Sequence, residues 1–145
     1  STTSRFARRL SQLSSMNVIV PNGGEVLKPG SLFITPGDSH LLLKNNETII
    51  LEKSEKVNFV RPSVDVTMMS LIPDSKNSFY GLILSGMGSD GAQGLMYMKK
   101  IGAQVFIQNP DTCTIRSMPE AAFRLTDVDR VLSPEEIHDF IISIK

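Results

Sequence analysis

The sequence predicts an α/β fold: a doubly wound, mostly parallel sheet in three layers, with an antiparallel ribbon inserted in the first half. Three observations predict it. From about residue 58 on, helix and strand patterns alternate, as in parallel strands joined by right-handed crossovers. The first half instead holds short strand patterns separated by turn residues, which is typical of antiparallel strands. A glycine-rich turn links one apolar strand to the next helix, as ligand-binding turns of such folds do.

In the first half, a helix pattern precedes the strands. Residues 4–13 predict a helix, because apolar side chains recur on one face. They are Phe6, Ala7, Leu10 and Leu13. Residues 17–20 suit a strand, and residues 21–30 are rich in turn residues. Three further strand patterns lie at residues 31–35, 40–43 and 48–51. We expect these three to form an antiparallel ribbon or small meander.

The second half carries the alternating pattern. Pro62 suits the first turn of a helix whose apolar residues recur at helical spacing. They are Val64, Met68, Leu71 and Ile72. Buried strands are expected at residues 79–84, 104–108 and 129–132, and helices at residues 92–101 and 118–125. The last helix has a clear start, in which Ser133 and Glu136 form a capping box and Pro134 takes the first position.

Length and composition are those of one ordinary globular domain. The 145 residues are 41% hydrophobic and 21% charged, which is enough to bury a core without disulfides. Lys plus Arg (15) balance Asp plus Glu (15), so we expect no nucleic-acid partner. No apolar run is long enough for membrane insertion, and the single Cys113 fits a reducing compartment. The chain begins without Met or a leader pattern, so we expect a processed or excised piece.

The turn at residues 86–91 is the most informative segment. Gly86, Gly88 and Gly91 spell G-x-G-x-x-G between a strand and a helix, the dinucleotide-binding fingerprint. The next strand ends near Asp111, about twenty residues on, where a ribose-binding acid would be sought. Against this interpretation, Asp90 lies beside the helix N-terminus, where its carboxylate would repel a pyrophosphate. Nucleotide binding therefore stays an alternative.

Asp90 has two compatible interpretations. It follows a parallel strand, so it lies at the carboxyl edge of the sheet, where α/β proteins bind ligands. An acid there, beside backbone N–H groups, suits the orienting member of a nucleophile–histidine–acid triad. The plainer interpretation is a helix cap, whose removal costs about 1 kcal/mol.

Motifs along the whole chain carry a family resemblance. Residues 85–92, Ser-Gly-Met-Gly-Ser-Asp-Gly-Ala, look like the T-G-M-G-x-D-G-A block of the bacterial protein-glutamate methylesterases, CheB. Residues 61–65 match the family's R-P-S-V-D. Three more blocks resemble S-x-F-A-x-R-L, P-G…I-A-P-G-x-x-H and M-P-x-x-A, at residues 4–10, 29–40 and 118–122 respectively. The motifs keep the family's order, so the chain is identified as a member.

The resemblance implies a Rossmann-like domain that hydrolyses γ-glutamyl methyl esters on chemoreceptors and, in related members, deamidates receptor glutamines. It implies a Ser-His-Asp mechanism with no cofactor. Asp90 would be the triad acid, and Met87 would give a backbone N–H to the oxyanion hole. The remaining candidates are the turn residues Gly86, Gly88 and Gly91, and two residues expected to line the cleft, His40 and Met118.

The chain departs from the family at its nucleophile and base. In the family, a G-x-S-x-G-G turn with the serine, and then the histidine, precede the helix that begins here near Ser4. This sequence has neither. We therefore expect residues 1–145 to be roughly the C-terminal three quarters of a methylesterase domain, inactive alone. Ser63 and Ser85 are the serines that would have to replace the missing nucleophile, but Ser85 has no histidine beside it in sequence. Ser117 stands where the family usually has glycine.

No metal site is expected, because the two histidines, His40 and His138, and Cys113 lie far apart in sequence and form no ligand cluster. His138 is expected on the solvated face of the last helix.

Partners follow from the resemblance. We expect methylated chemoreceptor helices as substrate, a receiver domain or chemotaxis adaptor as regulator, and a cytoplasmic location. If the family's first strands are absent, exposed sheet edges would also favour self-association. Two other functions stay open: a non-catalytic relative that binds receptor or adaptor, and a nucleotide-binding domain.

Overall fold

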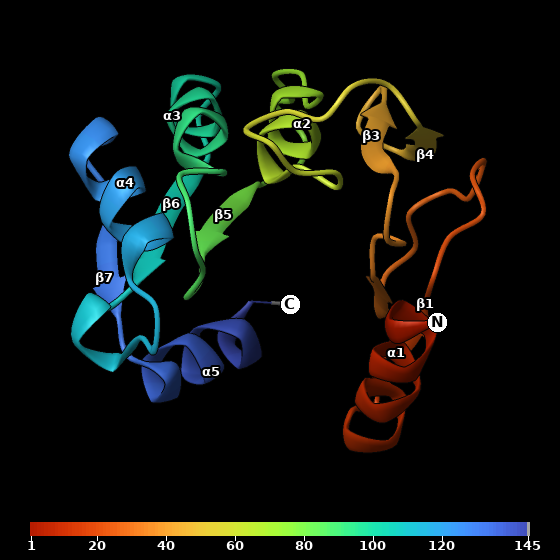
Figure 1. Ribbon diagram of the computed structural model, residues 1–145, viewed down its shortest axis with the longest axis horizontal. Helices are drawn as coiled ribbons and strands as arrows, with labels where there is room; N and C mark the ends of the chain where they lie inside the picture. The colour runs from red at the N-terminus through yellow and green to blue at the C-terminus, as the bar shows by residue number, and fades with distance from the viewer. Residues whose placement is uncertain (145) are drawn as a thin grey trace. The chain divides into compact units, whose positions relative to one another are not determined.

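A computed structural model describes residues 1–144 (Figure 1). The chain forms two compact units, the first spanning Ser1–Leu71 and the second beginning at Ile72. The amino-acid composition does not change near residue 71, so it does not predict this division. Both units contain helices and strands. Each unit is described by itself.

The first unit opens with a capped helix. Helix α1 (Thr2–Leu13) begins after Ser1, whose hydroxyl accepts a hydrogen bond from the Ser4 N–H at 3.2 Å. Ala7 is the buried residue of this helix, whereas Phe6 and Leu13 are exposed. The predicted helix is therefore confirmed, but part of its apolar face is not covered by the described residues.

Strands of the first unit pair in two separate ribbons. Strand β1 (Asn17–Ile19) pairs in parallel with β2 (Ser31–Phe33), and β3 (His40–Lys44) pairs antiparallel with β4 (Thr48–Glu52). The antiparallel ribbon is confirmed as a hairpin, whereas the three-stranded meander is wrong. Residues 20–30 bring the chain back beside β1 in the same direction. Short apolar runs do not specify which partner a strand takes.

Helix α2 (Val64–Met69) starts later than the sequence predicts. Its N-cap is Ser63, whose hydroxyl accepts from the Val66 N–H at 3.5 Å. Pro62 therefore lies before the helix and not in its first turn, which corrects that expectation. The buried Asp65 accepts a hydrogen bond from the Asn58 side-chain amide at 2.7 Å, so the helix start is tied to the preceding loop.

The second unit is a small three-layer α/β structure. Its strands are parallel in the order β5–β6–β7, with Tyr80 opposite Gln104 and Phe106 opposite Arg130. In chain order the elements are β5 (Tyr80–Ile83), α3 (Ala92–Lys100), β6 (Gln104–Gln108), the 3₁₀ turn η1 (Pro110–Thr112), α4 (Ser117–Leu125), β7 (Arg130–Leu132) and α5 (Pro134–Ser143). The alternating order and the parallel sheet of this half are confirmed.

Helices cover both faces of this sheet. In Figure 1, α3 and α4 lie on one side and α5 on the other. The Phe140 ring of α5 lies 4.7 Å from the Phe106 ring and 5.2 Å from the Tyr80 ring, between centroids. The core of this unit holds fully buried apolar side chains, among them Ile83, Leu95, Val105, Ile107 and Leu132. This packing fixes the carboxyl ends of β5 and β6, where the candidate site lies.

The start of α5 has the predicted capping box. The Ser133 hydroxyl accepts from the Glu136 N–H at 3.2 Å, and the Glu136 carboxylate accepts from the Ser133 N–H at 3.0 Å. Within residues 1–144, no helix is both long and apolar enough to cross a bilayer.

Candidate functional site

The glycine turn connects the end of β5 to the start of α3. Gly88 and Gly91 have φ values of 92° and 97°, a conformation that glycine adopts without strain. The turn separates two candidate residues by exposure: Met87 is 77% exposed, whereas Asp90, just before the N-cap Gly91, is 7% exposed. The turn therefore exposes Met87 to solvent and buries the carboxylate of Asp90.

Hydrogen bonds dock this turn on the loop that follows β6. The Gly86 N–H donates to the Ile115 carbonyl at 3.0 Å, and the Met118 N–H donates to the Gly86 carbonyl at 3.1 Å. A Cβ atom on Gly86 would lie 2.5 Å from the Met118 Sδ. The Met118 side chain therefore packs directly against the backbone of the turn, and glycine at position 86 permits this close approach.

Ser85 also takes part in the hydrogen bonds between the strand end and the loop that follows β6. Its hydroxyl donates to the Ile115 carbonyl at 3.1 Å and accepts from the Ile115 N–H at 3.4 Å. Its N–H donates to the Gln108 side-chain oxygen at 3.0 Å. Ser85 is thus a structural residue at the strand end, where its hydrogen bonds tie β5 to β6 and to the loop after it.

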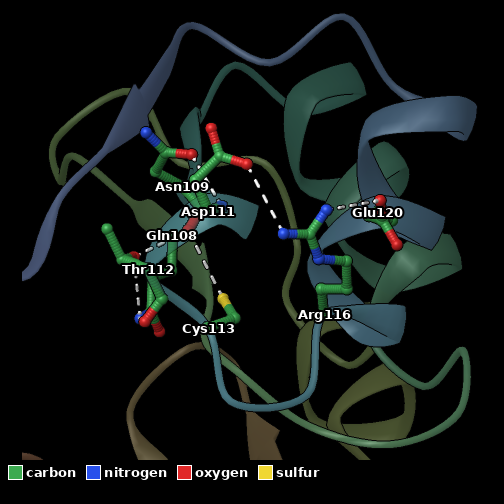
Figure 2. A network of polar contacts seen from close by, with 7 residues as sticks. All are labelled: Gln108, Asn109, Asp111, Thr112, Cys113, Arg116 and Glu120. Atoms are coloured by element: carbon green, nitrogen blue, oxygen red, sulfur yellow. Dashed lines mark hydrogen bonds and ion pairs between the residues drawn. The ribbon is translucent and has the colours of Figure 1, made fainter.

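Figure 2 shows the polar network that holds this second loop. Arg116 forms ion pairs with Asp111 at 3.4 Å and with Glu120 at 3.9 Å. The Asn109 side-chain oxygen accepts from the Asp111 N–H at 3.0 Å, which caps η1. Cys113 is half-buried, and its thiol donates to the Asn109 carbonyl at 3.5 Å. Asp111 thus has a local structural role in this loop.

His40 belongs to the first unit and is fully buried there, with 0% exposure. Its Nδ1 accepts from the Ser63 N–H at 3.1 Å, and its Nε2 lies 2.8 Å from the Glu55 carbonyl oxygen. This pattern requires the neutral ring with its proton on Nε2. His40 is therefore a structural residue that joins β3 to two loops. The expectation that it lines an open cleft is wrong, because both ring nitrogens and the whole ring surface are covered.

Ser63 and His138 have equally plain roles. Ser63 is fully buried and caps α2. His138 lies on the exposed side of α5, with its Nδ1 3.5 Å from the Asp139 carboxylate. No group of three or more histidine, cysteine or acidic residues placed to hold a metal occurs in residues 1–144.

Asp38 and Glu136 are two of the carboxylates outside the turn whose pKa values are lowered. The Arg61 guanidinium, which bonds to Asp38 at 2.5 Å, lowers the pKa of Asp38. The hydrogen bond from the Ser133 N–H lowers the pKa of Glu136. Both groups stabilise local structure, a loop of the first unit and the start of α5.

Sequence reasoning missed how the second loop supports the turn. Gln108 and Ser117 both bond to it, Ser117 through Gly86 and Gly88. The available signal was that Gln108 ends β6 and Ser117 follows it, while the turn follows the neighbouring β5. The carboxyl ends of parallel strands meet at one edge of the sheet. The pattern gave no means of telling which side chain bonds to which peptide.

The fold and the turn define a class: a doubly wound α/β domain with an acid-bearing glycine turn at the carboxyl end of a parallel strand. The model of the CheB methylesterase family matches residues 1–141, so the chain belongs to the CheB methylesterase family.

Known relatives agree. The chain is 38% identical over 138 residues to "Protein-glutamate methylesterase/protein-glutamine glutaminase 1" of Dechloromonas aromatica, covering 93% of this chain and 39% of that protein. It is 36% identical over 137 residues to a putative protein of the same description from Leptospira interrogans, covering 94% and 71%. The chain therefore spans about two fifths of the first of these relatives.

A solved structure supports the fold assignment. The crystal structure of the Thermotoga maritima CheB methylesterase catalytic domain matches with a TM-score of 0.89 and 34% identity, covering 99% of this chain and 77% of that one. The predicted α/β class and the family resemblance are confirmed.

Proposed function

We propose that residues 1–145 are the C-terminal part of a protein-glutamate methylesterase domain and supply its triad acid and oxyanion-hole turn. The observation that carries this proposal is the turn itself, with Asp90 buried at its end and Met87 exposed at its tip. In the complete reaction, a serine attacks the ester carbonyl, a histidine takes the serine proton, and methanol leaves. Water then releases the glutamate from the acyl-enzyme.

Asp90 would orient the histidine. A buried carboxylate that accepts the histidine Nδ1–H fixes the ring tautomer and stabilises the imidazolium that forms during attack. The 7% exposure of Asp90 supports this role, because shielding from water strengthens the interaction.

Met87 would contribute through its backbone. Among residues 1–144, the Met87 N–H has no acceptor, and the residue is exposed at the tip of the turn. A free, oriented N–H group suits an oxyanion formed during ester attack, and loss of one such donor typically costs about 10²–10³ in kcat.

The same site would act on glutamine side chains, since an amide passes through the same tetrahedral oxyanion and releases ammonia in place of methanol. The proposed substrates are methylated chemoreceptor helices. A receiver domain or an adaptor as regulator, and a cytoplasmic location, go with this proposal.

The test compares two polypeptides on methylated receptor. We expect the 145-residue chain to release no methanol, because Ser63, Ser85 and His40 are all committed to structural hydrogen bonds. The full-length gene product should release it. Turnover by the 145-residue chain at a rate like that of the full-length product would show that the nucleophile and base lie within this chain.

A non-catalytic relative stays as the second candidate. Such a relative would bind receptor or adaptor without turnover. A full-length product that binds methylated receptor and releases no methanol would favour it.

A further inference from the structure

We infer that the Ser117 hydroxyl is a positioning residue for the oxyanion-hole peptide, an inference that rests on the proposed function of Met87. Ser117 is the first residue of α4 and lies across from the glycine turn. Its hydroxyl donates to the Gly86 carbonyl at 3.2 Å and accepts from the Gly88 N–H at 3.3 Å. One side chain therefore bonds to the backbone on both sides of Met87.

These two bonds set the direction of the Met87 N–H. The Gly86 carbonyl and the Met87 N–H belong to one planar trans peptide group, so they point in opposite directions. The carbonyl is held by two donors, the Ser117 hydroxyl and the Met118 N–H at 3.1 Å. The Met87 N–H must then point away from α4, on the side where the residue is exposed.

The second bond fixes the following peptide in the same way. Because the Gly88 N–H points at Ser117, the Met87 carbonyl points away from it. With both flanking peptides held, the exposed Met87 cannot rotate its N–H without breaking a bond to Ser117. Gly88 needs such a restraint, since glycine with φ of 92° has wide backbone freedom.

The family resemblance leads us to expect glycine at position 117, where this chain has a serine. A glycine there has no hydroxyl, so the Met118 N–H alone would hold the carbonyl. The Ser117 hydroxyl adds a second restraint that this chain does not share with such relatives.

The first arm of the test measures the hydrogen bond from the Gly88 N–H to the Ser117 hydroxyl in the 145-residue chain. Amide hydrogen exchange followed by NMR should show the Gly88 N–H protected, and Ser117→Ala should speed its exchange by about 2–10-fold, as expected for loss of one hydrogen bond. Ser117→Thr keeps a hydroxyl and should restore the protection. Equal exchange in wild type and Ser117→Ala would overturn the inference.

The second arm measures ester hydrolysis by the full-length gene product. Ser117→Ala should lower kcat about 10-fold with KM changed less than about twofold, because a donor is misaligned rather than removed. Ser117→Thr should recover kcat. A merely structural role would leave kcat unchanged and move only the melting temperature, and that result would overturn the inference.

The two arms separate this inference from the proposed function. An active wild type whose kcat is insensitive to Ser117→Ala refutes the positioning role alone. A wild type with no turnover refutes the proposed function and the positioning role with it, even if the Gly88 N–H is protected.

Discussion

Single residues of the glycine turn have separate tasks. Gly86 allows Met118 to approach the backbone, Gly88 and Gly91 take conformations with positive φ, and Asp90 supplies the buried carboxylate. A substitution at each position should therefore fail in its own way: by collision, by backbone strain, or by loss of the acid.

Gly86→Ala tests the collision. We expect it to lower the free energy of unfolding by about 1 kcal/mol, at the low end for overpacking because the methionine side chain is flexible. Urea unfolding measures this cost. The control is the same substitution in a Met118→Ala background, where the collision at 2.5 Å is removed and the cost should shrink. An equal cost in both backgrounds would contradict the assigned contact.

At the scale of elements, the features that depend on neighbouring residues were predicted best. The capping box of Ser133 and Glu136 and the strand–turn–helix order after residue 78 follow from residues close in sequence. Pairing of β2 with β1 and the start of α2 were not predictable in this way. Which strands pair depends on contacts between segments that are far apart in the sequence. The start of α2 was ambiguous, because a serine N-cap and a proline in the first turn are both common at helix starts.

The capping box makes α5 sensitive to pH. A carboxyl group whose pKa is lowered by folding stabilises the folded state above its unfolded pKa of about 4.3, and this contribution is lost as pH falls through the folded pKa. Wild type should therefore melt at a higher temperature than Glu136→Gln at pH 7, and the difference should shrink as the pH falls through the lowered pKa of Glu136.

Glu135→Gln is the matched control, since it removes the same charge one position away from the capping box. Thermal melts across this pH range should show a smaller difference for Glu135→Gln. A Glu136→Gln difference that stays constant from pH 7 to pH 3 would rule out the capping carboxylate as its source.

At the scale of the whole molecule, sequence motifs predicted the family and the acid-bearing turn, and they did not predict the loop contacts that hold it. Asp90 and the glycines lie in one short segment, so the sequence motif itself contains the residues proposed to act. His40 was assigned to the cleft from its motif alone, whereas its ring joins a strand to two loops. The division at Leu71 likewise depends on contacts that composition does not record.

The sheet edges lead to a prediction for the chain in solution. Among the described residues, β5 and β7 each pair with β6 alone, and unpaired edges favour strand addition between molecules. We expect the 145-residue chain to self-associate at micromolar concentration, as seen by sizing chromatography with light scattering. A stable monomer would count against this expectation.

The central claim is that Asp90 acts as the triad acid. Its most direct test is methanol release from methylated receptor by the full-length gene product carrying Asp90→Asn, with Asp139→Asn on the exposed side of α5 as the control. We predict that Asp90→Asn lowers kcat about 10³–10⁴-fold, because the histidine loses its orienting carboxylate, while Asp139→Asn stays close to wild type. Wild-type turnover by the Asp90→Asn protein would contradict the assignment.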